Sequence, residues 1–137
     1  MSVTLTDQDK LTLRTAAFGA VSLMTAVGAV GGSAHKIATD GSLALSSATG
    51  VVGHVLAEKS TAGMNLKGKS VAELADQVLP ALTAAMSLLE QQAPAEADNF
   101  RSTVLVAIEA ATRARKGQPS PTMTEMTRKI TAALDAA

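Results

Sequence analysis

The feature that most constrains the fold is a stretch without charged side chains near the start of the chain. Residues 15–34 are mostly Ala, Gly, Ser and Thr, with only a few larger apolar side chains among them. Apolar residues recur through and before this stretch at helical spacing, for example Leu13, Ala17 and Met24. A helix that is apolar around most of its circumference is buried. We therefore expect a central helix that begins near Thr6 and ends at the glycine pair 31–32.

The same stretch is long enough to span a bilayer, so a membrane or signal segment must be considered. Small and weakly polar residues fill most of it, and such residues gain little from transfer into lipid. A signal peptide would begin with a short basic region, whereas Asp7 and Asp9 precede this stretch. We expect a buried helix and no membrane contact.

The rest of the chain predicts further helices separated by loops. Asp40-Gly41 indicates a turn, and residues 35–41 are predicted to form a connection. A second helix is expected over residues 42–59, although Gly50 and Gly53 lower its propensity. A third begins at Ser70, a fourth at Pro94 and a fifth at Thr122, and Pro80 should kink or split the third. The predicted fold is all-α, a single-domain bundle of four to five helices over residues 1–137.

Composition limits the possible chemistry. The chain has 137 residues, no cysteine, and equal numbers of basic and acidic residues. Disulfides and cysteine-based metal sites are therefore excluded, and a reducing, cytoplasmic location is expected. The zero net charge gives no general attraction to nucleic acid, and we expect no nucleic-acid partner. The alanine-rich composition favours a bacterial source.

Small residues repeat at a spacing of four, which allows helices to approach closely. One interpretation is close packing of the first two predicted helices within one chain. The other is self-association, because long apolar side chains that could cover the first helix are few. We expect a homodimer through these two helices. The pairs are Ala16 and Ala20, Gly28 and Gly32, Ser46 and Gly50, and Thr49 and Gly53.

Charge is segregated along the second half of the chain. Residues 70–100 carry acidic side chains and no Lys or Arg, whereas residues 101–129 are rich in Arg and Lys. Packing of neighbouring helices with opposite charge explains this pattern. The alternative is a basic surface for an anionic partner, with the last two helices arranged as a helix-turn-helix.

One complete motif match lies before the third helix. Gly63, Gly68, Lys69 and Ser70 fit G-x-x-x-x-G-K-S and resemble the phosphate-binding loop of P-loop NTPases. The resemblance implies backbone N–H groups around phosphates, Lys69 on the terminal phosphates and Ser70 on Mg²⁺. It covers eight residues. The family places this loop after a strand of a parallel sheet, whereas the segment before it here is better read as helical. Nucleotide or anion binding at this loop is therefore an alternative hypothesis.

The histidines and methionines suggest two further sites. His54 and Glu58 are one helical turn apart and could share a metal, with His35 or Asp40 as a third ligand. A hydrogen-bonded structural histidine is the competing interpretation.

Flexible thioethers such as Met24 and Met86 can line an apolar pocket, in which His54 would be a polar contact. The same methionines would serve equally as fillers of the core.

The leading functional hypothesis is a non-enzymatic structural or interaction module that self-associates and needs no cofactor. A protein that binds a small apolar ligand between its helices is the second hypothesis, and binding at residues 63–70 is the third. No catalytic residue can be singled out from the pattern.

Overall fold

The structure is a computed structural model, and it describes residues 5–28, 34–57, 70–114 and 121–137. These residues form α-helices and contain no strand, which confirms the all-α class. The described residues form six helices rather than the expected four to five. They are α1 (Asp7–Gly28), α2 (Ala34–Ser46), α3 (Gly50–Ala57), α4 (Val71–Gln92), α5 (Pro94–Ala114) and α6 (Pro121–Asp135).

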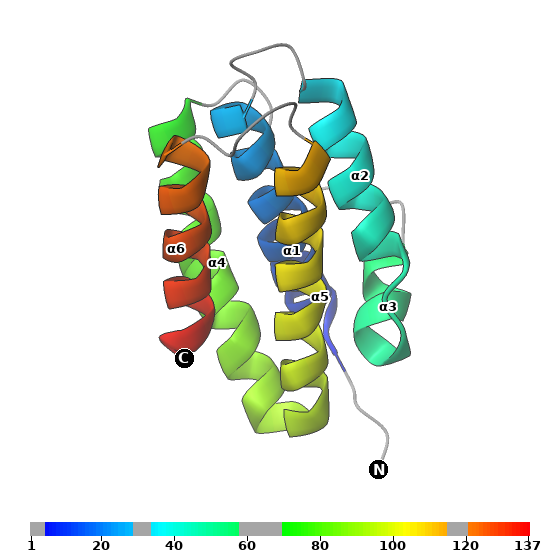
Figure 1. Ribbon diagram of the computed structural model, residues 1–137. Helices are drawn as coiled ribbons and strands as arrows, with labels where there is room; N and C mark the ends of the chain where they lie inside the picture. Colours follow the sequence, from blue (N-terminus) through cyan, green and yellow to red (C-terminus); the bar gives the residue numbers. More distant parts are fainter. Residues whose placement is uncertain (1–4, 29–33, 58–69, 115–120) are drawn as a thin grey trace.

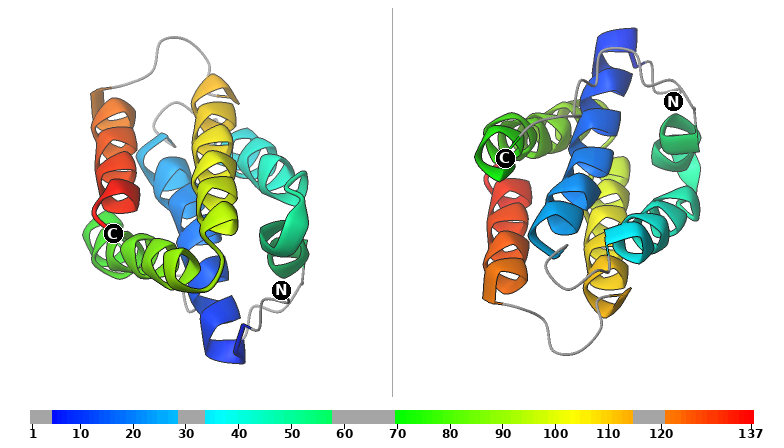
Figure 2. Two further views of the ribbon diagram at one scale, coloured as in Figure 1. Left: turned by 90° about the horizontal axis from the view of Figure 1, so that it is seen from below. Right: turned by 90° about the horizontal axis from the view of Figure 1, so that it is seen from above.

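The first helix lies at the centre of the bundle, as its apolar circumference predicts. Figure 2 shows α1 between α4 and α6 on one side and α2 and α5 on the other, and α1 contacts each of these helices. By length and composition alone α1 could cross a membrane, and 67% of its most apolar window is buried inside the protein. We expected a second chain because few long apolar side chains were available to cover the first helix. In the structure, helices of the same chain cover it. The dimer through the first two predicted helices stays a prediction.

The start of α1 is capped as expected. The Thr6 hydroxyl accepts a hydrogen bond from the Asp9 backbone N–H at 3.0 Å, and the Thr6 N–H donates to Asp9 Oδ2 at 3.2 Å. The Gln92 side chain adds a hydrogen bond to the same carboxylate oxygen at 3.3 Å. Helix α1 is therefore fastened at its first turn to the end of α4.

The prediction of a connection over residues 35–41 is wrong, because these residues lie within α2. Gly41 is in this helix because it packs on α1: a Cβ there would lie 2.9 Å from Val21 Cγ1. Lys36 and Asp40, one turn apart, form an ion pair of 2.7 Å that also suits a helix. The glycine that indicated a turn is a helix-packing residue.

The single helix predicted over residues 42–59 is also wrong, because α2 ends at Ser46 and α3 begins at Gly50. Gly50 has a φ of 72°, which glycine adopts without strain and which breaks the helix. The expected pair Ser46 and Gly50 therefore does not share a helix face. Gly53 faces the backbone of the break instead, and a Cβ there would lie 2.2 Å from the Ala48 carbonyl oxygen.

Helix α4 confirms its predicted start. Ser70 and Glu73 form the reciprocal capping box, with hydrogen bonds of 3.1 and 3.2 Å. Pro80 does not split the helix, which continues from Val71 to Gln92. Its ring lies on the exposed side of α4, where no neighbouring helix must be displaced.

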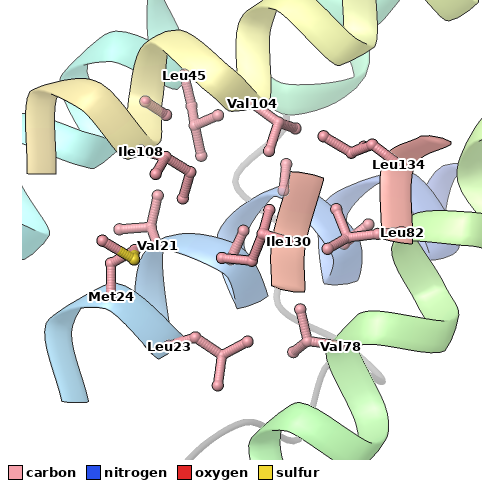
Figure 3. Close-up of a cluster of buried hydrophobic side chains, with 14 of the residues drawn as sticks. Val21, Leu23, Met24, Leu45, Val78, Leu82, Val104, Ile108, Ile130 and Leu134 are labelled. Carbon is pink, nitrogen blue, oxygen red and sulfur yellow. The ribbon is translucent and has the colours of Figure 1, made fainter. Parts of the chain in front are cut away.

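The core is built from side chains of different sizes around α1. Ala16, Ala17 and Ala20 are fully buried, and a Cβ at Gly19 would lie 2.5 Å from Val78 Cγ2. Close approach of helices within one chain therefore accounts for the small residues of α1. Larger side chains fill the space toward the other helices (Figure 3), including Val21, Leu23, Met24, Leu45, Val78, Leu82, Val104, Ile108, Ile130 and Leu134.

Candidate functional site

The most distinctive surface lies where α2 and α5 run side by side in opposite directions (Figure 1). Leu43 of α2 is 63% exposed and Val106 of α5 is 51% exposed. Each lies on the solvent side of its helix, and Val106 lines a cavity between the two helices. Large apolar side chains on adjacent elements mark a possible interaction site more strongly than a single one does. We call the surface around Leu43 and Val106 the α2–α5 face.

A shallow cavity of about 210 Å³ indents this face. Its polar side chains are largely engaged within the protein: the Ser47 hydroxyl donates to the Ala44 carbonyl at 2.7 Å, and the Thr103 hydroxyl donates to the Asn99 carbonyl at 2.7 Å. The cavity has no charged side chain in its lining. The lining residues are Ala44, Ser47, Ala48, Thr49, Asn99, Ser102, Thr103 and Val106.

Next to this cavity, side chains of α5 form hydrogen bonds with the backbone at the start of α3. Glu96 Oε1 accepts a hydrogen bond from the Val52 N–H at 3.1 Å and another from Asn99 Nδ2 at 3.3 Å. Asn99 Nδ2 also donates to the Thr49 carbonyl at 2.8 Å. A carboxylate at a helix N-terminus satisfies free N–H groups and suits the positive end of the helix dipole. Glu96 therefore caps α3 from another helix.

Charged residues border the α2–α5 face on both helices. Lys36 and Asp40 pair on α2, and Arg113 Nη1 lies 2.9 Å from Glu109 Oε1 on α5. Asp98 is exposed nearer the start of α5. The uncharged centre of the face is thus flanked by charges, an arrangement typical of an apolar interface core with a polar rim.

A second cavity, of about 290 Å³, lies between α5 and α6. The Thr112 hydroxyl donates to the Ile108 carbonyl at 2.9 Å, and the Thr127 hydroxyl donates to the Met123 carbonyl at 2.9 Å. With these donors engaged by the helix backbone, the threonines add methyl groups to an apolar groove. We call this the α5–α6 groove, and Leu105, Ile108, Glu109, Thr112, Thr124 and Thr127 line it.

The residues proposed for an apolar pocket do not meet in either cavity. Met24 is fully buried, and its sulfur lies 3.8 Å from the Thr127 hydroxyl oxygen. Met86 is buried on α4, and His54 is exposed on α3. None of the three lines the α2–α5 cavity or the α5–α6 groove. Both methionines contribute to the core.

The proposed metal ligands are also only partly placed. His35 and His54 are exposed on α2 and α3, Asp40 is paired with Lys36, and Glu58 lies outside the described residues. Within the residues that the structure describes, no three His, Asp or Glu side chains are grouped closely enough to hold a metal ion.

Of the phosphate-loop match, Ser70 lies among the described residues, whereas Gly63, Gly68 and Lys69 lie outside them. Ser70 is the N-cap of α4, and its hydroxyl accepts the Glu73 N–H. The Glu73 carboxylate is at the same helix end, where it disfavours a phosphate by like-charge repulsion. The preceding described element is the helix α3 rather than a strand. Phosphate binding at this loop stays a prediction.

An ion pair joins α5 and α6, and its acidic partner lies outside the acidic segment of residues 70–100. Arg101 of α5 binds Asp135 of α6 through its Nε atom at 2.9 Å. The hydrogen bond to Asp135 raises the pKa of the Arg101 guanidinium further above its ordinary value. This pair joins α5 and α6 at the end of the chain.

Sequence reasoning missed three features of the structure. No sequence pattern singled out Leu43 or Val106 as exposed apolar residues on adjacent helices. Glu96 was read only as part of an acidic segment, and its pairing with Val52 spans distant parts of the chain. Arg14 precedes the uncharged stretch, yet it is only 7% exposed. In each case the environment of the side chain is set by residues that are distant in the sequence. Local sequence patterns do not contain that information.

Comparisons with protein-family models, with curated proteins and with solved structures found nothing that matches the chain. The functional assignment therefore depends on the surfaces described above.

Proposed function

We propose that this chain is a non-enzymatic helical module that self-associates through the α2–α5 face. The observation that carries the proposal is the exposure of Leu43 and Val106 on adjacent helices, where Val106 lines a cavity without charged side chains. Burial of such side chains against a partner is favourable by about 25 cal/mol per Å² of apolar surface. This proposal moves the expected contact from the buried α1 to an accessible pair of helices.

Measurement of mass at several concentrations tests the proposal. Sedimentation of the unmodified chain should show a shift from monomer to dimer as concentration rises, and Leu43→Ser with Val106→Ser should abolish the shift. Val71 offers a matched control, since it is also a large apolar side chain, 38% exposed, at the start of α4. Val71→Ser should leave the shift unchanged. A chain that stays monomeric at every concentration would contradict the proposal.

A second candidate function is the binding of a small, uncharged apolar molecule in the α5–α6 groove. The specific observation is a cavity of about 290 Å³ in whose lining the Thr112 and Thr127 hydroxyls are already engaged by the helix backbone. This volume is close to the lower limit of ligand pockets, about 300 Å³. The ligand would therefore be small.

The neutral dye Nile red provides a direct test of this groove. Its fluorescence should rise on addition of the protein and should fall with Thr112→Arg, which adds a long, charged side chain to a groove that Glu109 already lines at one edge. Thr122→Arg introduces the same charge at an exposed position that does not line the groove, and it should have no effect. Equal fluorescence with both variants would exclude the groove as the dye site.

A further inference from the structure

The exposed side of α5 carries a ridge of residues that spans the helix. Asp98, Ser102, Val106, Glu109 and Arg113 are all exposed, and they follow one another at intervals of three or four residues. This spacing places them on one side of an α-helix. The opposite side is buried in the core and includes Phe100, Val104, Ala107 and Ala111. The ridge is therefore the part of α5 that a partner would meet first.

The ridge has an acidic residue near one end and a basic residue near the other. When a second copy runs in the opposite direction, the acidic end of each ridge therefore meets the basic end of the other. We infer that two copies pair through α5 in antiparallel orientation, about a two-fold axis between Leu105 and Val106. Residues at equal distances from that axis then face each other across the interface. Asp98 of each copy faces Arg113 of the other, and Ser102 faces Glu109. The inference rests on the proposed self-association and names the orientation and register of its partner.

Alternative alignments of the same ridges are less favourable. A parallel pair would place Asp98, Glu109 and Arg113 each against its own equivalent, which is repulsive. A slip of one helical turn in one direction would place Asp98 opposite Glu109. A slip in the other direction would bury Val106 against Glu109. Like charges across the interface select against the parallel pair and the first slip, and burial of the Glu109 carboxylate against an apolar side chain selects against the second.

Neighbouring charges are compatible with the inferred register. Arg113 already pairs with Glu109 in its own helix at 2.9 Å, and both side chains are about two-thirds exposed. Arg113 can therefore turn toward a second carboxylate without leaving a buried charge. On α2, Lys36 and Asp40 neutralise each other at 2.7 Å. Leu43 is exposed on α2, the helix that packs along α5, and in such a dimer it would add apolar surface to the contact.

The absence of cysteine from the chain makes a cross-linking test specific. In the inferred register, Val106→Cys should form a disulfide-linked dimer under mild oxidation, because the two introduced thiols lie next to the axis. Ser102→Cys alone should not, whereas Ser102→Cys combined with Glu109→Cys should. Ala132→Cys places a thiol on the exposed side of α6 and serves as the control. Circular dichroism of each variant establishes that the helices are retained.

Charge reversal tests the same register independently. Asp98→Arg and Arg113→Asp should each weaken dimerisation by about tenfold, since two equivalent surface pairs are lost. The combined variant should recover most of the affinity, because the reversed charges again face each other.

A dimer that forms but shows no cross-link at position 106 and no recovery in the combined variant would overturn the inferred register while leaving self-association intact. A dimer lost with Leu43→Ser but unaffected by both charge reversals would also overturn it and would place the contact on α2. A chain that is monomeric at all concentrations would refute the proposed function itself.

Discussion

At position 19, the lack of a side chain allows Val78 of α4 to pack directly on the backbone of α1. Gly→Ala within a helix usually stabilises it, by up to about 1 kcal/mol. Here the added methyl would lie 2.5 Å from Val78 Cγ2. We expect Gly19→Ala to lower the free energy of unfolding by about 1–3 kcal/mol, the usual cost of overpacking. Urea unfolding measures this change.

The control for that prediction is the neighbour itself. In a Val78→Ala background the clash is removed, so Gly19→Ala should cost much less or become stabilising. Equal costs in both backgrounds would show that Val78 is not the cause.

A titratable residue at the start of α1 gives a pH-dependent prediction. The Thr6 backbone N–H, followed by the Gln92 side chain, lowers the pKa of Asp9 below its ordinary value of 3.8. A depressed carboxyl pKa stabilises the folded state above the unfolded pKa, and this stabilisation is lost as pH falls through the folded pKa. Asp9→Asn should therefore be less stable than the unmodified chain at neutral pH. The difference should shrink well below pH 3.8, as thermal unfolding at both pH values can show.

At the scale of elements, α3 depends on a cap from α5. It has only eight residues, too few for a stable isolated helix. Loss of an N-cap costs about 0.5–2 kcal/mol. We expect Glu96→Ala to speed hydrogen exchange at the Val52 amide by about tenfold, with little change at amides in the middle of α1. Glu96→Gln keeps an acceptor oxygen and should have a smaller effect.

The matched control is Glu90→Ala, which removes an exposed carboxylate near the end of α4. It should leave exchange in α3 unchanged. If Glu90→Ala accelerated exchange as much as Glu96→Ala, general charge rather than capping would be responsible.

Helix α4 tolerates a proline at its centre, and this too is testable. Proline in a helix interior costs about 3 kcal/mol relative to alanine, because it lacks an N–H and clashes with the preceding turn. Pro80 is exposed, so its replacement removes no core contact. Pro80→Ala should raise the free energy of unfolding by about 1–3 kcal/mol in urea titrations. A decrease would indicate that the rest of the bundle requires the altered helix geometry.

The predictability of the elements follows from the range of the interactions that define them. Caps such as Ser70 with Glu73 join residues three apart, so the sequence alone was sufficient to place them. The break at Gly50 depends on Glu96 and Asn99 of α5, and the helical state of Gly41 depends on Val21 of α1. These partners are distant in the chain, and local patterns therefore misplaced the ends of α2 and α3.

For the whole molecule, the all-α class could be predicted because apolar residues recur at helical spacing in every segment. The central position of α1 could be predicted for the same reason. The candidate face could not, because no local pattern shows that α2 and α5, which carry the exposed Leu43 and Val106, lie side by side. Sequence patterns report which side chains are apolar, whereas exposure is decided by the neighbours that cover them.

Salt should separate the stability of the whole molecule from its self-association. Ion pairs such as Lys36–Asp40 and Arg101–Asp135 lie at the surface, where each contributes little to folding. Raising salt from about 0.1 M to 1 M shortens the Debye length from about 10 Å to 3 Å. The free energy of unfolding of the Leu43→Ser, Val106→Ser variant should change by less than about 1 kcal/mol over this range.

Dimerisation of the unmodified chain should weaken several-fold as salt is raised, because its register depends on Asp98 facing Arg113. Sedimentation in both salts measures the second effect, and a dimer strengthened by salt would instead indicate a contact dominated by apolar surface.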